Sequence, residues 1–376
     1  MSLSPAFIKI LAETEEKYGN ILRPMQEGNN RRVPIGPFTL DWCLRGGLPT
    51  NRLSLICGHK GTYKTTLALK ALVGYQARCG DCLEFKDNCQ CSAPAEYLSI
   101  FIDMEHALDE SHAIRLGVDK SKVYILKPPN GEAACEYAER LSRVPEVGMI
   151  IKDSLASLVP EEELKKGYLD KISQSHRARL IARMVRALVI HTDQADHPRF
   201  AIMLNHLLPN RYGGGDILPG GEEQKYMCSV VLKLWKSKVY TVDAETDEVV
   251  QYDDSGRRVR TGKGGRKKLI PDEPEEKPEV IRQEVGFLVE HSKVSSDRLS
   301  GEFRLILGEE GGLRFGDADD VDAVLARAGR LKLLEQNGGW LVNGEQFATQ
   351  KAMKEAFLAD RRKLDRFKSV VLRTRV

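Results

Sequence analysis

The chain has 376 residues, of which 41% are hydrophobic and 30% charged, and its 57 basic and 54 acidic side chains leave a formal net charge of +3. These values are ordinary for a soluble globular protein, and the length allows one large core with one or two small appendages. The sequence holds no apolar run of 18 residues and no signal peptide, so we expect a cytoplasmic protein with no membrane partner. In that compartment eight cysteines argue against a disulfide framework.

Residues 1–36 are predicted to form a helix and a linker. Ser4 and Pro5 are a helix-start pair, and the apolar residues that follow fall on one helical stripe to about residue 18. A polar linker at 20–36 comes next. From about 37 to 308 apolar strands alternate with helical segments, which predicts an α/β fold with a mostly parallel central sheet.

A strand, a glycine-bearing loop and a helix follow one another near residue 60. An apolar run that ends at Cys57 precedes the loop, and a helix-like run follows it. Backbone N–H groups of such a loop and the N-terminus of its helix cradle phosphate oxygens. Lys64 is expected to reach the β- and γ-phosphates of ATP, and Thr65 to ligate Mg²⁺. The predicted cofactor-binding loop consists of Gly58, His59, Lys60, Gly61, Thr62, Tyr63, Lys64, Thr65 and Thr66.

Tyr63 departs from the usual pattern, G-x-x-x-x-G-K-[ST], because it stands where the second glycine belongs. We expect its ring to point away from the phosphates while its N–H still faces them, provided that the backbone angle φ suits a residue other than glycine. On this stretch alone, a turn before a core helix is an equally good interpretation.

Four of the eight cysteines form two close pairs separated by a short loop, in the segment at 79–91. Two pairs of this kind wrap one tetrahedral Zn²⁺ with four thiolates, and the metal fixes a loop that lacks a core of its own. The alternative is a set of free surface thiols. We predict a structural zinc site, with the ligands Cys79, Cys82, Cys89 and Cys91.

Two further apolar strands end in carboxylates. The run from Ile100 leads to Glu105, and the run from Gly148 leads to Asp153. Polar residues at the carboxyl ends of strands beside a phosphate loop line the ligand crevice of an open α/β sheet. Asp153 suits the role of holding Mg²⁺ through water, and Glu105 suits a base that orients the attacking water. Either carboxylate alone would be read as a strand-end cap, but the two in this order favour an ATPase.

Three polar segments interrupt the core. Residues 160–176 mix bases with an aromatic and residues 206–224 are rich in glycine, although solvated loops are the simpler interpretation of both on composition alone. The third, at about 240–284, has a basic block and then a Pro-rich acidic block, typical of a disordered segment or a hairpin tip. Its functional interpretation is an extra contact with duplex DNA.

From about 309 to 376 the pattern is that of a small α/β appendage. It contains a helical segment from Val321, a short strand at Trp340–Val342 and a basic helical end from Lys351. A basic end of this kind would help to capture duplex DNA.

The order of these motifs resembles that of the RecA-family recombinases from about residue 5 to 345. The most specific match is the stretch from Phe101 to Asp109, and the others are at 14–19, 40–49, 58–66, 115–119, 153–156 and 311–315. The bulky residue at 63 and the histidine at 206 resemble the phage branch, the UvsX-like recombinases, which suggests a phage-encoded protein of the bacterial cytosol.

The resemblance implies roles for further residues. It places adenine contacts at Asp109 and His112 and a γ-phosphate sensor at His206, where cellular RecA has a glutamine. It makes Lys293 a lysine that reaches the ATP of a neighbouring protomer, so the catalytic set is Glu105, Lys64, Lys293 and His206. It also assigns the helix of residues 1–36 to oligomerisation and marks the segment at 79–91 as an insertion.

The same resemblance assigns DNA binding to the loops at 160–176 and 206–224. Basic side chains there would contact phosphates and aromatic rings would stack on bases. The predicted DNA-binding residues are Lys165, Lys166, Tyr168, Lys171, His176, Arg211, Tyr212, Gly213 and Gly214.

We therefore expect an ATP-dependent DNA strand-exchange recombinase, a DNA-dependent ATPase that forms helical filaments on single-stranded DNA and pairs it with homologous duplex. Its cofactors would be ATP, Mg²⁺ and structural Zn²⁺. Its partners would be both forms of DNA, further copies of the chain, and single-strand-binding and loader proteins.

Two alternatives remain at this stage. A RecA-fold hexameric DNA helicase motor is disfavoured by the full-length order of the motifs. A non-catalytic filament-forming DNA-binding protein, in which Tyr63 has disabled the loop, is disfavoured because Lys64, Glu105 and Asp153 are all retained.

Overall fold

The computed structural model describes residues 4–18, 31–165, 174–210, 213–242, 249–252, 258–260, 268–269, 280–308, 313–336, 340–342 and 344–374. By its internal contacts the chain divides into two compact units, Met1–Arg31 and Arg32–Val376. The first contains α1 (Pro5–Tyr18), which begins as predicted, since the Ser4 hydroxyl accepts the N–H of Phe7 at 3.3 Å. Within this unit the side chains of Phe7, Ile8 and Ile10 are exposed.

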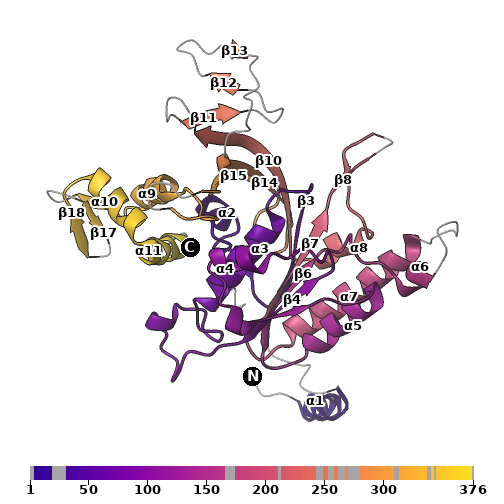
Figure 1. Ribbon diagram of the computed structural model, residues 1–376. Coiled ribbons are helices and arrows are strands. Elements are labelled where there is room, and N and C mark those ends of the chain that lie inside the picture. The colour runs from indigo at the N-terminus through magenta and orange to yellow at the C-terminus, as the bar shows by residue number, and fades with distance from the viewer. Residues whose placement is uncertain are drawn as a thin grey trace. The chain divides into compact units, whose positions relative to one another are not determined.

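The second unit is built on one large sheet (Figure 1). Its parallel strands pair in the order β10 (Val230–Val242), β3 (Arg52–Gly58), β7 (Phe200–His206), β6 (Val147–Asp153), β4 (Leu98–Asp103) and β5 (Val123–Leu126). This order confirms the predicted α/β fold with a mostly parallel central sheet. It also brings the carboxyl ends of β3, β7, β6 and β4 to one edge, where the phosphate loop begins.

Antiparallel strands extend the sheet beyond β10. β14 (Val280–Ser292) pairs with β10 and with β15 (Leu299–Ile306), and β11 (Val249–Tyr252), β12 (Arg258–Arg260) and β13 (Lys268–Leu269) follow on the other side. The described parts of the segment at 240–284 are therefore strands of a long ribbon, as the hairpin interpretation predicted. The rest of that segment lies outside the described residues.

Helices cover both faces of the parallel strands. α2 (Phe38–Cys43) and α3 (Lys64–Gln76) pack on one face, and α5 (Gly131–Leu141) and α7 (Gln174–Asp193) on the other, each with its own apolar core. Burial on both faces explains why these strands read as continuous apolar runs. The shorter elements of the core are α4 (Glu110–Arg115), α6 (Glu161–Lys165), α8 (Glu223–Met227) and the strand pairs β1 (Arg32–Val33) with β2 (Leu48–Pro49) and β8 (Leu208–Pro209) with β9 (Asp216–Ile217).

The C-terminal segment packs around a third apolar core, which Phe38 of α2 joins. It comprises α9 (Val321–Arg330), the small sheet β16 (Glu335–Gln336), β17 (Trp340–Val342) and β18 (Glu345–Phe347), α10 (Gln350–Ala359) and α11 (Arg361–Arg373). The predicted helix from Val321 and strand at Trp340–Val342 are confirmed. The basic end is two helices, because Asp360 breaks the first and caps the second by accepting the N–H of Lys363 at 3.1 Å. In the part of the chain that the structure describes, no helix is both long and apolar enough to cross a membrane.

Candidate functional site

The glycine-bearing loop joins β3 to α3 and closes around the ammonium group of Lys64. The Lys64 Nζ donates to the carbonyl oxygens of Gly58 at 3.0 Å and of His59 at 2.9 Å. The hydroxyl of Thr62 also donates to the His59 carbonyl, at 2.8 Å. The helix begins at Lys64, so its free N–H groups face the loop. This arrangement places one cation and a helix N-terminus at a single point, which is what phosphate oxygens require.

Tyr63 adopts a left-handed backbone conformation, with φ 63° and ψ 25°. We expected this loop to tolerate a tyrosine only if φ suited a residue other than glycine, and this φ does not. Position 63 has the left-handed backbone that glycine adopts most easily. The half-buried ring packs against the apolar core beneath α3, and the Lys236 ammonium lies 5.8 Å from its centroid. Contacts of the side chain thus offset the strain of the backbone, and the ring is directed into the protein.

The Thr65 hydroxyl donates to the carboxylate of Asp153 at 2.6 Å. Asp153 ends β6 and is only 8% exposed. Burial raises the pKa of Asp153 to about 6, and the negative charge of Glu105 adds to the effect, although the hydrogen bond from Thr65 and the charge of Lys64 act against it. A hydroxyl and a buried carboxylate side by side are suitable oxygen ligands for a hard divalent cation. The chemistry of these two residues therefore fits Mg²⁺, and their role as its ligands stays a prediction.

Glu105 and His206, which the sequence analysis treated separately, are in direct contact. The Nε2 of His206 lies 2.5 Å from the Oε1 of Glu105, and the Ser157 hydroxyl donates to the same oxygen at 3.3 Å. Partial burial raises the pKa of Glu105, but hydrogen bonds from Ser154 and His206 outweigh it and hold that pKa below its usual range. The carboxylate is thus kept ionised, the state that accepts a proton from water.

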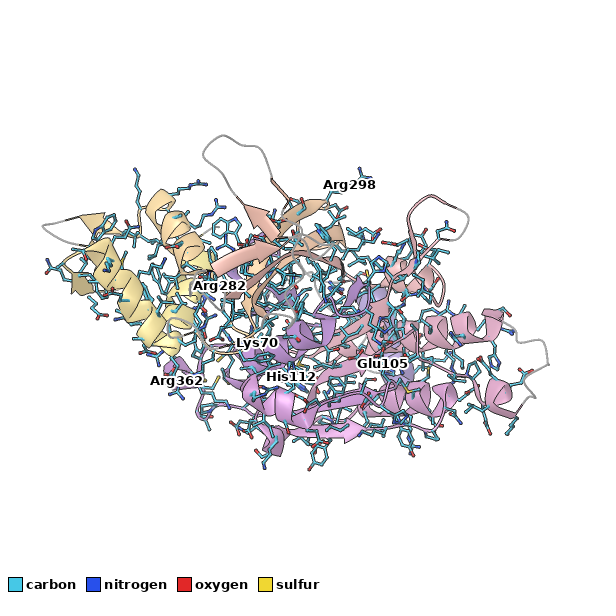
Figure 2. All side chains as sticks on the ribbon, turned by 45° about the horizontal axis from the view of Figure 1, so that its top comes forward. Lys70, Glu105, His112, Arg282, Arg298 and Arg362 are labelled. Atoms are coloured by element: carbon cyan, nitrogen blue, oxygen red, sulfur yellow. The ribbon has the colours of Figure 1, made fainter. Side chains whose placement is uncertain are left out.

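The adenine candidates lie on the segment that follows β4, as does Glu105 (Figure 2). Asp109 caps α4, since its carboxylate accepts the N–H of His112 at 3.0 Å. The His112 ring meets Phe315 edge to face, with ring centroids 5.0 Å apart, and burial lowers the pKa of His112. Phe315 was not predicted as a site residue, although the stretch that contains it carried part of the resemblance.

The described residues of the first predicted DNA loop are engaged with acidic side chains. Lys165 forms an ion pair with Glu161 at 2.5 Å, and His176 lies 3.3 Å from a carboxylate oxygen of Glu162. Lys166, Tyr168 and Lys171 lie outside the described residues. A DNA role for this loop therefore stays a prediction.

The second predicted DNA loop carries the β8–β9 hairpin. Gly213 and Gly214 are exposed at φ 83° and 91°, and a Cβ at either position would meet no atom within 4 Å. Arg211 and Tyr212 lie outside the described residues. Asp216, at the base of the hairpin, lies 3.2 Å from the imidazole of His59 in the phosphate loop. No sequence signal indicated this link, because only the fold brings the two loops together.

Lys293 lies apart from the phosphate loop of its own chain. Its Nζ donates to the carbonyl oxygens of Tyr226 at 2.7 Å and of Met227 at 3.4 Å. For the described residues the structure gives no contact between Lys293 and Lys64 or Glu105. A role within its own active site is not supported, and the role towards a neighbour stays a prediction.

The sulfur atoms of Cys79, Cys82, Cys89 and Cys91 all lie within 4.8 Å of one another. Cys79 is 3.9 Å from Cys91, and Cys82 is 3.5 Å from Cys89. A tetrahedral Zn²⁺ with bonds of about 2.3 Å to sulfur separates its ligands by roughly 3.8 Å, whereas a disulfide bond is about 2.05 Å long. The Cys79 sulfur also accepts the N–H of Ala95 at 3.2 Å, which favours a thiolate. The cluster is therefore compatible with one zinc ion.

Comparison with known proteins shows matches along most of the chain. The model of the RecA N-terminal domain matches residues 6–261. The chain is similar to Protein RecA of Bifidobacterium longum, with 28% identity over 362 residues that cover 93% of this chain and 75% of that protein. It is 29% identical to Protein RecA of Synechocystis over 347 residues, which cover 90% of this chain and 81% of the relative. With Protein RecA of Picosynechococcus it shares 32% identity over 205 residues, which cover 54% of this chain and 53% of the relative.

Proposed function

Because the chain belongs to the RecA family, we propose that it is a DNA-dependent ATPase that acts in DNA recombination and repair as a strand-exchange recombinase. The observation that carries this proposal is the convergence of Lys64, Thr65, Asp153 and Glu105 at the carboxyl edge of the sheet. The ammonium group of Lys64 interacts electrostatically with the carboxylates of both Asp153 and Glu105. The three parts of an ATPase site, a phosphate cation, a metal pair and a base, are thus within reach of one ligand.

In this proposal Lys64 exchanges the carbonyls of Gly58 and His59 for the β- and γ-phosphates of ATP. Mg²⁺, when bound at Thr65 and Asp153, neutralises charge on the phosphates. Glu105 orients the attacking water and accepts its proton. His206 contacts Glu105, and the γ-phosphate of ATP would compete for the same imidazole, so this residue would report the nucleotide state to the loop that follows it.

The DNA-binding surface in this proposal consists of the loops at 160–176 and 206–224, with single-stranded and duplex DNA as ligands. Gly213 and Gly214 are exposed, and a Cβ at either would meet no atom within 4 Å, so the loop has room beside them for a DNA strand. Filaments would form through α1 of the segment 1–36, whose apolar side chains are exposed within its own unit, and through Lys293 acting on the ATP of a neighbour. Single-strand-binding and loader proteins are the further partners that a filament of this kind needs.

The remaining assignments are also proposals. The domains would be 1–36, the ATPase core at 37–308 and a C-terminal domain at 309–376, whose basic helices favour duplex DNA. Tyr63 and His206 support the UvsX-like phage branch. A hexameric helicase and a non-catalytic assembly protein are the alternatives, and the closure of the loop around Lys64 despite Tyr63 argues against the second.

Electron microscopy of the full chain with single-stranded DNA tests the proposed function. With a non-hydrolysable ATP analogue we expect extended helical filaments, and with ADP shorter or no filaments. Closed six-membered rings that unwind a forked duplex would favour the helicase. Filaments that form without any nucleotide binding would favour the non-catalytic protein.

We also propose one structural Zn²⁺ at the four cysteines. Metal analysis of the dialysed protein should give one zinc ion per chain, and Cys82→Ser combined with Cys91→Ser should remove it. A zinc content near zero, or one that the double substitution leaves unchanged, would contradict the assignment.

A further inference from the structure

The segment at 79–91, called the cysteine loop here, contacts the last helix of the chain. Glu84 accepts from the guanidinium of Arg373 at 2.7 Å, and Asp87 forms an ion pair with Arg366. Both carboxylates lie between Cys82 and Cys89, on the stretch that a metal at the four sulfurs would close into a ring. In its described residues the loop has no helix or strand longer than the three-residue turn Lys86–Asn88. Its backbone is fixed near Glu84, whose carbonyl accepts the N–H of Cys79 at 2.9 Å, whereas the side chains of Glu84 and Asp87 are held by α11.

Arg78 joins the base of the cysteine loop to the same helix. It is 8% exposed, and its guanidinium lies 4.2 Å from the centroid of the Phe85 ring. It donates to the Gly74 carbonyl at 2.7 Å and to the hydroxyl of Ser369, on α11, at 3.3 Å. The end of α3, the cysteine loop and α11 therefore meet at one buried cation.

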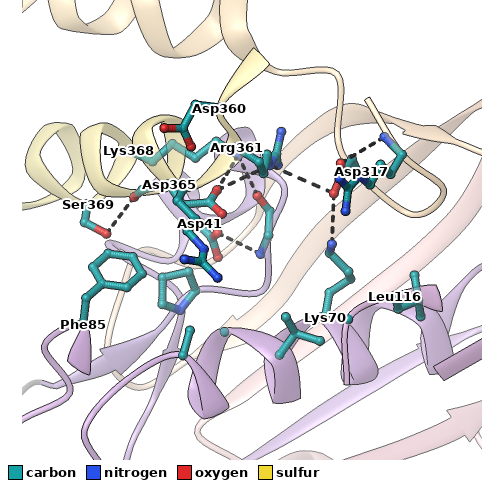
Figure 3. Close-up of a pocket in the computed structure, with 18 of the residues that line it drawn as sticks. Asp41, Lys70, Phe85, Leu116, Asp317, Asp360, Arg361, Asp365, Lys368 and Ser369 are labelled. Carbon is teal, nitrogen blue, oxygen red and sulfur yellow. Dashed lines mark hydrogen bonds and ion pairs between the residues drawn. The ribbon is translucent and has the colours of Figure 1, made fainter. Parts of the chain in front are cut away.

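Both halves of α11 also have contacts with the core. Lys368, in the second half, binds Asp320 at 2.6 Å. Arg361, at the start of the helix, lies 4.0 Å from Asp317, which also binds Lys70 of α3 at 3.1 Å (Figure 3). A cavity of about 530 Å³ lies between α3, Phe85 and α11. Phe85 of the cysteine loop and Ser369 and Leu372 of α11 line this cavity, and among the described residues the ion pairs between the loop and the helix are those of Arg373 and Arg366.

We propose that the metal at the four cysteines docks the C-terminal half of α11 onto the core, by holding Glu84, Asp87 and Phe85 where Arg373, Arg366 and Arg78 meet them. This inference rests on the zinc site proposed above. Without the metal, the four cysteines no longer close the loop into a ring, and the carboxylates of Glu84 and Asp87 gain conformational freedom. Forming the two ion pairs then costs more conformational entropy, so each pair is weaker. The apolar side chains Leu364, Phe367 and Val371 keep the helix in place, so the effect is a local loosening and not an unfolding.

Hydrogen exchange measured by mass spectrometry on the full chain tests the inference, with zinc content measured in the same samples. Removal of zinc by a chelator should speed amide exchange in residues 366–373 by about threefold to twentyfold, the range that two exposed ion pairs support. Exchange at 361–365 and in β4 and β6 should stay unchanged. Reloading with zinc should restore the slow exchange.

Substitutions separate the docking from the metal. Glu84→Gln combined with Asp87→Asn should keep one zinc per chain and speed exchange at 366–373 as chelation does, and chelation should add little further. Glu136→Gln is the matched control, because this carboxylate pairs with Arg140 of its own helix α5 at 3.2 Å and, among the described residues, contacts neither the cysteine loop nor α11. It should leave the exchange of α11 unchanged.

The outcomes distinguish the inference from the metal site. If zinc is present and its removal leaves exchange at 366–373 unchanged, the docking role is wrong while the site stands. If the protein binds no metal, both are wrong. If chelation speeds exchange everywhere, the protein unfolds without metal, and the Glu84 and Asp87 double substitution then decides: unchanged exchange at 366–373 overturns the inference, and faster exchange there alone supports it.

Discussion

At Tyr63, burial of the ring stabilises the folded protein, whereas the left-handed backbone destabilises it. An aromatic ring that is half buried removes on the order of 100 Å² from water, worth about 2.5 kcal/mol at ~25 cal/mol per Å². A left-handed conformation costs a residue with a Cβ about 1 kcal/mol or more, and glycine nothing. We expect Tyr63→Gly to lower the free energy of unfolding by about 1.5 kcal/mol, because the lost burial of the ring outweighs the relief of strain.

The comparison of glycine with alanine at this position isolates the strain. Both substitutions remove the ring, but Tyr63→Ala keeps the penalty of the positive φ. At an ordinary position alanine is more stable than glycine by about 0.5–1 kcal/mol, because it restricts the unfolded chain. Here we expect the reverse, with alanine less stable than glycine by a similar amount, and Tyr63→Phe close to the natural protein.

Urea unfolding followed by circular dichroism gives the stability order, and titration with a fluorescent ATP analogue gives the affinity of each variant. All variants that remain folded should bind nucleotide within a few-fold of the natural protein, since the loop needs only a backbone N–H at this position. An alanine variant more stable than the glycine variant would refute the strain argument. A glycine variant that binds nucleotide more than a hundredfold more weakly would show that the ring itself supports the site.

Lys64→Ala should abolish ATP turnover, whereas Glu105→Gln should keep nucleotide binding and filaments and lose hydrolysis; turnover of the purified Glu105→Gln protein at the natural rate would remove Glu105 from its role. Burial raises the pKa of Asp153 from the ordinary 3.8 to about 6. Ionisation of this carboxylate therefore lowers the stability of the metal-free protein as the pH rises from about 4 to 6. Below a pH of about 6, protons compete with Mg²⁺ for the carboxylate. Mg²⁺-dependent nucleotide affinity should therefore fall from pH 7 to pH 5, and an equal fall in Asp153→Asn would argue against that group. Lys293→Ala should keep nucleotide binding by the monomer and lose DNA-stimulated turnover. Mixing it with Glu105→Gln should restore part of the turnover, because some interfaces then combine an intact Lys293 with an intact Glu105. Mixed filaments that stay inactive at every ratio would contradict a shared site.

The sequence by itself determined the fold class and indicated which residues would form the main site. The apolar strands that end at Gly58, Asp103 and Asp153 alternate with helices along the chain, and this alternation predicted the mostly parallel sheet. Spacing along the chain was enough for Lys64 and Thr65, because a phosphate loop is local. It was also enough for the four cysteines, whose sulfurs the structure brings together.

Only the tertiary structure decided the contacts between loops that are distant in the chain. Glu105 with His206, His59 with Asp216, and His112 with Phe315 each join different segments, and nothing in the local pattern of either partner encodes the other. The same holds for the docking of Glu84 on Arg373, since it depends on where α11 packs. The positive φ of Tyr63 depends on both the sequence and the tertiary structure. The motif indicated the position, but it is the packing of the ring on the core beneath α3 that offsets the backbone strain.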